Sequence, residues 1–298
     1  MEIERTPDSA FTDLPDFPYE PKYRDWNGMR LAYIDEGEGE PVLLLHGEPT
    51  WGFLWRHVMT PLLDAGYRCI VPDLPGFGRS DKPTDIGWFN FDRMADSIST
   101  LVDNLGLEGT TLVCHDWGGP IGLRVATLDR PEQFTRLVAM NTGIFTGYQK
   151  MTDNWHHFAD FIASHEDVMI SMPIQGAAVT DLSDEIVAAY EAPFHSVASK
   201  ASVRAMPPMI PQEPDAPGAA SGQATAEYLL KDDRPALLLW GDSDPALPLD
   251  PVGRAVQMLF PQAAPLTVLE KAGHFVQEDQ GQLIGEEIVK FLEANPAG

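Results

Sequence analysis

The sequence predicts an α/β fold, in which helices cover both faces of a mostly parallel, doubly wound sheet and a helical segment is inserted between two strands. Two observations predict this class. Short apolar runs typical of buried strands alternate along the chain with amphipathic runs of helical period. The alternation stops between about residues 144 and 223, where only helical pieces are expected, and then resumes.

Seven runs are expected to form the sheet. The first alternates apolar and polar residues, as a half-buried strand does, and the next three are continuously apolar. Continuous apolar strands are typical of parallel sheets that helices cover on both faces. In chain order the runs are "RLAYIDEG" (30–37), "PVLLLHG" (41–47), "RCIVPDLPG" (68–76), "TTLVCHD" (110–116), "RLVAMNT" (136–142), "PALLLWGD" (235–242) and "PLTVLEKAGH" (265–274).

The segment between the third and fourth strands carries a clear helical pattern. It reads "NFDRMADSISTLVDNLG" (90–106), and its apolar residues fall on one face of a helix. Gly106 suits the left-handed residue that commonly follows the last turn of a helix. A helix between two buried strands is the repeating unit of a doubly wound sheet.

The inserted segment predicts a cap. Ligands of open α/β sheets bind beyond the carboxyl ends of the strands, so a helical insertion between two strands would lie over the ligand site. The stretch "MPPMIPQEPDAPG" (206–218) ends the insertion, and its prolines exclude a regular helix or central strand. We expect a core domain from residues 1–143 and 224–298, and a helical cap from residues 144–223 that includes "DNWHHFADFIASHEDV" and "LSDEIVAAYEAPF".

The composition predicts a globular protein. The chain has 298 residues, of which 44% are hydrophobic, enough for a sizeable core. Cys69 and Cys114 lie in apolar runs without disulfide or metal-site spacing, which favours a reducing compartment. The start, "MEIERTPDSAF", does not resemble a signal segment, and no run approaches the ~18 apolar residues of a membrane span. We therefore expect a soluble, cytoplasmic protein.

The formal net charge of −25 narrows the classes of partner. Such a chain lacks the basic surface that neutralises phosphates, so neither nucleic acid nor an anionic membrane is an expected partner. The acidic residues are scattered along the chain and do not form a tail. Two interpretations remain open: a solubilising surface, or adaptation to high salt, where screening relieves the self-repulsion.

Three candidate catalytic residues fall at the carboxyl ends of predicted strands, in the order Asp116, Asp244 and His274. Each has an ordinary structural alternative. Asp116 could cap the next helix, Asp244 could stabilise a turn, and His274 could be a hydrogen-bonded loop residue. Together, on an α/β pattern, they occur in the chain order nucleophile, acid, base of hydrolases whose nucleophile lies at a strand-to-helix turn.

Four segments resemble the haloalkane dehalogenases of the α/β-hydrolase superfamily: "LLLHGEPTWGFLWR", "VPDLPGFGRSDKP", "CHDWGGPIG" and "AGHFVQED". The resemblance runs from about residue 20 to the C-terminus and is thinner in the cap, where "AYEAPF" (189–194) is the clearest match. "HGEPTW" is the specific motif, because "DWGG" also occurs in epoxide hydrolases. One departure is Cys114, which stands at the first glycine position of the turn and is small enough to preserve it.

The resemblance implies an α/β-hydrolase fold and hydrolysis of a haloalkane to an alcohol, a halide (chloride or bromide) and a proton, without metal or other cofactor. It implies that Asp116 is the nucleophile, His274 the base that activates water, and Asp244 the acid that orients the imidazole. A haloalkane has no carbonyl, so a carboxylate displaces the halide and forms an ester that water can attack. The backbone N–H groups of Glu48 and Trp117 would form the oxyanion hole.

The resemblance also implies two donors for the departing halide. Trp117, next to the nucleophile, is the first candidate, because an indole N–H is a donor on a rigid apolar ring. In the family the second halide donor is either an asparagine directly after "HG" or a tryptophan in the cap. This chain has Glu48 where that asparagine would be. Trp155 is the one tryptophan in the predicted cap, and its alternative role is packing of a cap helix. In the other family pattern the triad acid follows the strand "RLVAM", where this chain has Asn141. The resemblance therefore assigns the triad acid to Asp244.

Two alternative functions stay open. An epoxide hydrolase would share Asp116 and His274 and would need O–H donors in the cap, for which Tyr148 and Tyr190 are candidates. A non-catalytic receptor on the same fold would be expected to have lost part of the triad, and none is missing. For any of these functions we expect a small-molecule ligand and a monomer or small homo-oligomer.

Overall fold

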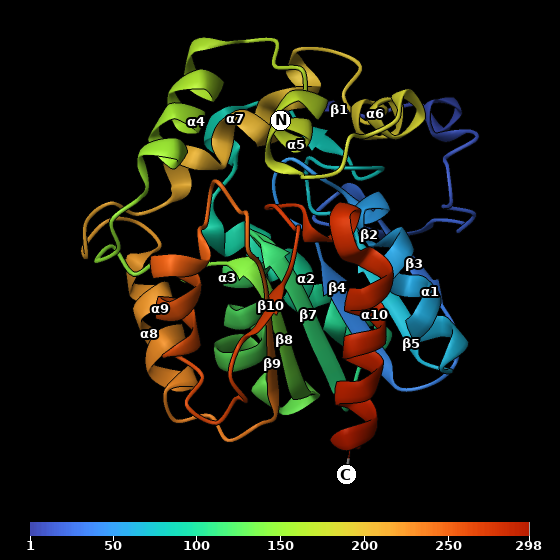
Figure 1. The fold of residues 1–298 in the computed structure, drawn as a ribbon. Helices are drawn as coiled ribbons and strands as arrows, with labels where there is room; N and C mark the ends of the chain where they lie inside the picture. Colours follow the sequence, from blue (N-terminus) through green and yellow to red (C-terminus); the bar gives the residue numbers. More distant parts are fainter. Residues whose placement is uncertain (298) are drawn as a thin grey trace.

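The computed structural model describes residues 1–297, and its centre is an eight-stranded sheet of order β10-β9-β8-β7-β4-β5-β3-β2 (Figure 1). The pairs from β10 to β5 are parallel, while β3 runs antiparallel to both β5 and β2. The strands are β2 (Lys22–Trp26), β3 (Met29–Glu36), β4 (Pro41–Leu45), β5 (Arg68–Pro72), β7 (Thr110–Asp116), β8 (Phe134–Thr142), β9 (Ala236–Gly241) and β10 (Thr267–Leu269). A separate two-stranded sheet pairs β1 (Ile3–Glu4) with β6 (Lys82–Pro83).

Helices cover both faces of the sheet, as the continuously apolar strands predict (Figure 1). On one face α1 (Arg56–Asp64) packs against α10 (Val276–Ala294). On the other, α3 (Gly118–Arg124) packs against both α2 (Phe91–Leu105) and α8 (Ala219–Leu229). The short α9 (Arg254–Gln257) follows β9. The doubly wound α/β class is therefore confirmed.

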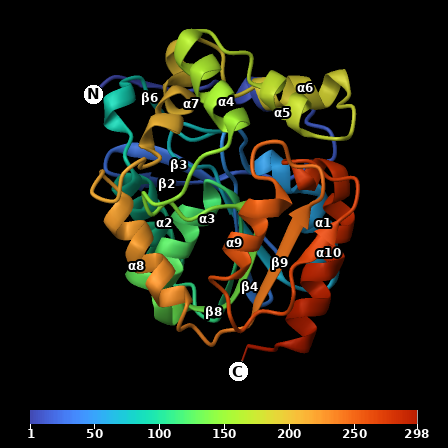
Figure 2. The ribbon, with the colours of Figure 1, turned by 60° about the vertical axis from the view of Figure 1, so that its left-hand side comes forward.

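The inserted segment lies above the sheet and consists mainly of helices (Figure 2). They are α4 (Asp153–Ser164), α5 (Ser171–Ala177), α6 (Asp184–Glu191) and α7 (Ala201–Ala205). The proline-dense stretch after α7 has only a short 3₁₀ turn at Pro207–Met209, as its composition predicts. The second cap boundary expected from the sequence, between residues 223 and 224, falls inside the unbroken helix α8. We keep the cap and core division as a proposal.

The details of the predicted elements follow from local chemistry. Helix α2 begins after Asn90, whose side chain accepts a hydrogen bond from the Arg93 N–H, and it ends at Gly106 with φ 57°. The last predicted strand is much shorter than its apolar run, because the chain turns after Leu269 and Lys271 adopts φ 55°. Strand β2 and helices α1 and α10 are additional elements that the sequence patterns did not predict.

The core of the sheet is fully buried at β4 and β7. Val42, Leu43 and Leu44 on β4 have no exposed surface, because helices cover them from both sides. Cys69 and Cys114 are buried free thiols, as expected from their apolar surroundings. Among residues 1–297, no helix is both long enough and apolar enough to cross a bilayer.

Candidate active site

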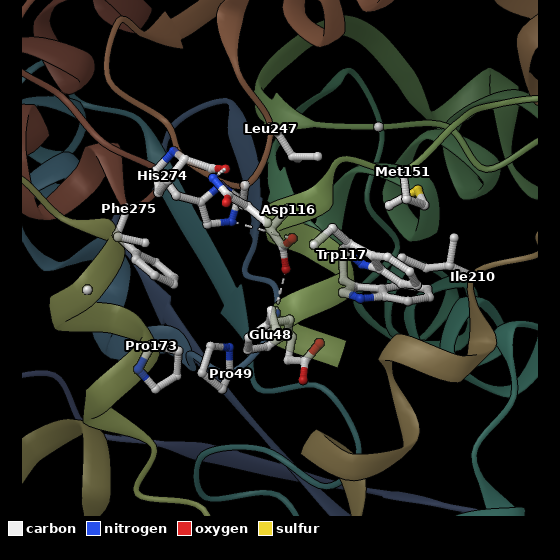
Figure 3. Close-up of a pocket in the computed structure, with 18 of the residues that line it drawn as sticks. Glu48, Pro49, Asp116, Trp117, Met151, Pro173, Ile210, Leu247, His274 and Phe275 are labelled. Carbon is white, nitrogen blue, oxygen red and sulfur yellow. Dashed lines mark hydrogen bonds and ion pairs between the residues drawn. The ribbon is translucent and has the colours of Figure 1, made fainter. Parts of the chain in front are cut away.

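Three sequence-distant residues meet at the carboxyl edge of the sheet. Asp116 is the last residue of β7, Asp244 lies just after β9, and His274 lies between β10 and α10. His274 Nδ1 is 2.8 Å from Asp244 Oδ2, and His274 Nε2 is 3.5 Å from Asp116 Oδ2. Figure 3 shows Asp116 between His274 on one side and Glu48 on the other. The structure therefore assembles the three residues that the sequence predicted.

Asp116 occupies a sharp turn from β7 into α3. Its φ of 48° lies in the left-handed region, which a non-glycine residue adopts only where the surroundings enforce it. Thr142 Oγ1 donates to the Asp116 carbonyl oxygen at 2.6 Å. Gly119 must be glycine, since a Cβ there would lie 1.7 Å from Thr142 Oγ1. Cys114, at the first glycine position of the turn, fits in the core with its Sγ 3.5 Å from the Val138 carbonyl oxygen.

The Asp116 carboxylate is held by backbone donors. Its Oδ1 accepts a hydrogen bond from the Glu48 N–H at 2.7 Å, and the nearby backbone N–H of Trp117 also favours the anionic form. Burial by itself would raise the pKa of Asp116, but the His274 imidazolium and these donors lower it below its ordinary value. Asp116 is thus an anion at neutral pH.

Asp244 is a buried carboxylate whose oxygens are all hydrogen-bonded. Its Oδ1 accepts from the Ala246 and Leu247 N–H groups at 2.7 and 2.8 Å. Its Oδ2 accepts from Asn141 Nδ2 at 2.7 Å as well as from His274. Against its burial, the His274 charge and these donors lower the pKa of Asp244 to about 2. Asp244 is therefore a fixed anion that is hydrogen-bonded to the imidazole.

His274 lies between these two anions. Burial would lower the pKa of His274, but the Asp244 and Asp116 carboxylates raise it to about 10. In the resting site the imidazole is consequently protonated and donates toward both carboxylates.

A cavity of about 390 Å³ opens onto Asp116 between the strand ends and the cap. In Figure 3, Trp117, Met151 and Ile210 lie on one side of Asp116, and Pro173 and Phe275 on the other. The cavity is lined by Glu48, Pro49, Asp116, Trp117, Gly143, Phe145, Met151, Asn154, Trp155, Phe158, Pro173, Gly176, Ala177, Ile210, Pro245, Ala246, Leu247, His274 and Phe275. Most of these side chains are apolar, which suits a small, weakly polar ligand.

Comparison with known proteins places the chain in a family. The model of the alpha/beta hydrolase fold matches residues 40–166. The haloalkane dehalogenase of Psychrobacter cryohalolentis is 37% identical, over 99% of this chain and the whole of that protein. That of Mycolicibacterium paratuberculosis is 35% identical, with 99% of each chain covered. The chain belongs to the haloalkane dehalogenase family.

A solved haloalkane dehalogenase supports the same assignment at the level of the fold. The tetrameric enzyme from Paraglaciecola agarilytica NO2 superposes with a TM-score of 0.91 at 33% identity, covering 96% of this chain and 97% of that one. The chain therefore shares its fold over nearly its whole length with a relative of known structure, and it is a hydrolase that acts on carbon–halide bonds.

Both tryptophans predicted for the halide line the cavity of this dehalogenase. Trp117 lies beside Asp116, and Trp155 comes from the cap helix α4. Among residues 1–297, no protein acceptor is hydrogen-bonded to either indole N–H. Three other indoles, by contrast, donate to protein oxygens: Trp26 to Asp96, Trp51 to Ala189 and Trp240 to Leu247.

The two tyrosines considered for an epoxide hydrolase lie elsewhere. Tyr148 is 73% exposed, and Tyr190 is fully buried with its O–H donating to Glu278. Neither lines the cavity, and no other tyrosine of residues 1–297 does. The dehalogenase therefore lacks, in this cavity, the pair of phenolic donors that an epoxide oxygen would need.

The structure adds site residues to which the sequence patterns assigned no such role. Asn141, recognised only as the place where an acid is absent, binds Asp244. His115 is fully buried, with its Nε2 hydrogen-bonded to the His274 carbonyl oxygen at 2.8 Å, and burial lowers its pKa to about 4. Glu48 is 6% exposed, and burial, followed by the Asp116 charge, raises the pKa of its carboxyl well above the ordinary value. The one feature of the sequence that could have pointed to His115 is its position directly before Asp116 in "CHDW".

Proposed function

We propose that this dehalogenase cleaves haloalkanes through a covalent alkyl ester on Asp116. The observation that carries the proposal is an anionic carboxylate at the strand-to-helix turn, with one oxygen held by the Glu48 N–H and the other facing His274 at the cavity. In the first step a carboxylate oxygen bonds to the carbon, and the halide leaves with the electron pair of the broken bond. The product is a neutral ester.

The second step hydrolyses this ester. Forming the ester removes the negative charge of Asp116, which is one of the two charges that raise the pKa of His274. The imidazolium then releases its Nε2 proton to solvent more easily, and the neutral imidazole can serve as the base, oriented by Asp244. Water loses a proton to Nε2 and its oxygen bonds to the Asp116 carboxyl carbon. The bond from that carbon to the alkyl oxygen then breaks, the imidazolium passes the proton to the alkyl oxygen, and the alcohol leaves. The new Asp116 carboxylic acid gives its own proton to Nε2, which restores the resting carboxylate and imidazolium. The Glu48 and Trp117 N–H groups stabilise the intermediate oxyanion.

We assign the departing halide to Trp117 and Trp155. Both line the cavity, and their N–H groups are not used by protein acceptors within residues 1–297. A halide that forms inside an apolar cavity needs hydrogen-bond donors, because an unpaired buried charge is costly. Two indoles supply these donors without adding a charge.

The preferred substrate class is a small halogenated alkane. A cavity of about 390 Å³ lies within the usual range for small-molecule sites, and its lining is mainly apolar. An epoxide substrate is disfavoured, because neither Tyr148 nor Tyr190 reaches the cavity. Bromide release from a bromoalkane, compared with diol formation from styrene oxide, measures this preference directly.

The covalent mechanism is tested by separating its two steps. The His274→Phe variant, given 1,2-dibromoethane, should release one bromide per active site and then stop, since only the second step needs the imidazole. Its mass should increase by one bromoethyl group on the peptide that contains Asp116. Asp116→Asn is the control and should give neither bromide burst nor adduct. A folded His274→Phe protein that releases bromide without an adduct would show that Asp116 is not the nucleophile.

A further inference from the structure

The segment "AGHFVQED" contains an acidic residue, Asp279, to which the mechanism above assigns no role. It lies in the first turn of α10, five residues after His274. Its carboxylate accepts hydrogen bonds from backbone N–H groups of two separate segments. One segment belongs to the cap, and the other is the loop that carries the catalytic histidine.

On the cap side, Asp279 binds the chain just beyond α5. Its Oδ1 accepts from the Thr180 N–H at 2.7 Å and from the Val179 N–H at 3.0 Å. The preceding residues, Gly176 and Ala177, form part of the cavity wall. This carboxylate therefore anchors a segment that continues directly into the wall of the substrate cavity.

On the core side, Asp279 binds the residue before His274. Its Oδ2 accepts from the Gly273 N–H at 2.8 Å. The next N–H, that of His274, donates to the Ala177 carbonyl oxygen of the cap at 2.7 Å. Gly273 has no room for a side chain, since a Cβ there would lie 2.1 Å from the same Ala177 oxygen. The histidine loop and the cap segment thus touch along their backbones.

We propose that Asp279 is a positioning residue that holds His274 in register with the cap for ester hydrolysis. Its two oxygens fix the relative position of the cap segment at Val179–Thr180 and the histidine loop at Gly273. The His274 Nε2 must lie within hydrogen-bond reach of the attacking water, and small displacements of a catalytic group are costly. Carbon–halogen cleavage depends on Asp116 and the halide donors and is less sensitive to this contact. The inference rests on the proposed covalent mechanism.

Asp279→Asn tests the inference with little change of shape. A carboxamide has one acceptor oxygen, so whichever way it turns, either Gly273 or the cap segment faces an NH₂ group. We expect ester hydrolysis to slow by about 10- to 100-fold. The kcat should fall by the same factor, while kcat/KM, which reports the steps up to halide displacement, should change by less than about threefold. Alkylated Asp116 should accumulate at steady state and be visible by mass spectrometry.

Two further variants distinguish positioning from general damage. Glu286→Gln removes a negative charge from an exposed position of the same helix and should leave both kinetic parameters unchanged. Asp279→Glu keeps both acceptor oxygens one methylene further from the backbone and should recover part of the hydrolysis rate. If Asp279→Asn does not fold, Asp279→Glu carries the test, with a kcat below that of the unmodified enzyme and kcat/KM unchanged.

The outcomes separate this inference from the mechanism on which it rests. Equal losses of kcat and kcat/KM in the Asp279 variants, or an unchanged kcat, would overturn the positioning role while His274→Phe still forms its adduct. Failure of His274→Phe to form an adduct on Asp116 would instead overturn the covalent mechanism itself.

Discussion

Trp155 is the residue on which the halide assignment depends most. It lies on α4 and lines the cavity, whereas the chain position that could otherwise supply a second donor holds Glu48. If Trp155 served only to pack α4 against the core, its loss would reduce stability but not halide affinity. Halide binding and helix packing therefore predict different results when Trp155 is replaced.

Trp155→Phe should weaken bromide binding and slow carbon–halogen cleavage, because it removes an N–H donor but keeps an aromatic ring. Loss of a hydrogen bond to a charged group costs about 1.5–3 kcal/mol, or roughly ten- to a hundredfold in bromide affinity. Bromide inhibition of steady-state turnover measures this change, and Trp88→Phe, at a residue that does not line the cavity, is the matched control. Unchanged bromide affinity and cleavage would remove Trp155 from the halide site.

At the scale of elements, three helices are joined by one buried ion pair. Arg56 on α1 donates to both oxygens of Glu278 on α10, each at 2.6 Å, and Tyr190 on the cap helix α6 donates to the same carboxylate. The Arg56 and Glu278 side chains are 1% and 2% exposed. Removing one partner of such a pair leaves the other as a buried, uncompensated charge.

Arg56→Met should therefore lower the free energy of unfolding by about 3–5 kcal/mol. The double variant Arg56→Met, Glu278→Gln should recover most of this loss, because it removes the stranded charge and still offers Tyr190 an acceptor. Urea unfolding measures the free energy of unfolding of the single and the double variant. Arg130→Met, which breaks the exposed pair with Asp103, is the control and should cost less than about 1 kcal/mol. A double variant as unstable as the single one would show that lost packing, rather than the charge, dominates.

At the scale of the whole molecule, the net charge of −25 is the dominant feature. Repulsion among surface carboxylates destabilises the folded state most at low ionic strength, where the Debye length reaches tens of ångströms and the charges are poorly screened. A solubilising surface and adaptation to high salt differ only in what happens after this repulsion has been screened.

We expect the melting temperature to rise as KCl is added up to about 0.3 M and then to level off, because the Debye length is by then below ~8 Å. Thermal unfolding followed by circular dichroism between low salt and molar KCl measures the profile. A continued, substantial rise between about 0.5 M and several molar KCl would contradict the solubility interpretation and identify the acidic surface as an adaptation to high salt.

The sequence by itself determined the class of fold and pointed to the candidate reacting groups. Apolar runs separated by an amphipathic helix predict parallel strands, since periodicity and turn residues are local properties that a single sequence displays. Asp116, Asp244 and His274 could be selected because each lies at or after the carboxyl end of a strand, and these strand ends of a parallel sheet share one edge. The short β2 and helices α1 and α10 were not predicted, although they complete the sheet and cover one face.

Only the tertiary structure decided which side chains face the cavity. Tyr148 and Tyr190 were both available in the sequence, with packing within "AYEAPF" as the simpler role for Tyr190; in the structure Tyr148 lies exposed and Tyr190 is buried against Glu278. Asp279 acquires its contacts because α10 brings it within reach of a cap segment about one hundred residues away in the chain. Such contacts depend on how helices and strands pack against one another, a long-range property that neither residue periodicity nor motif spacing encodes.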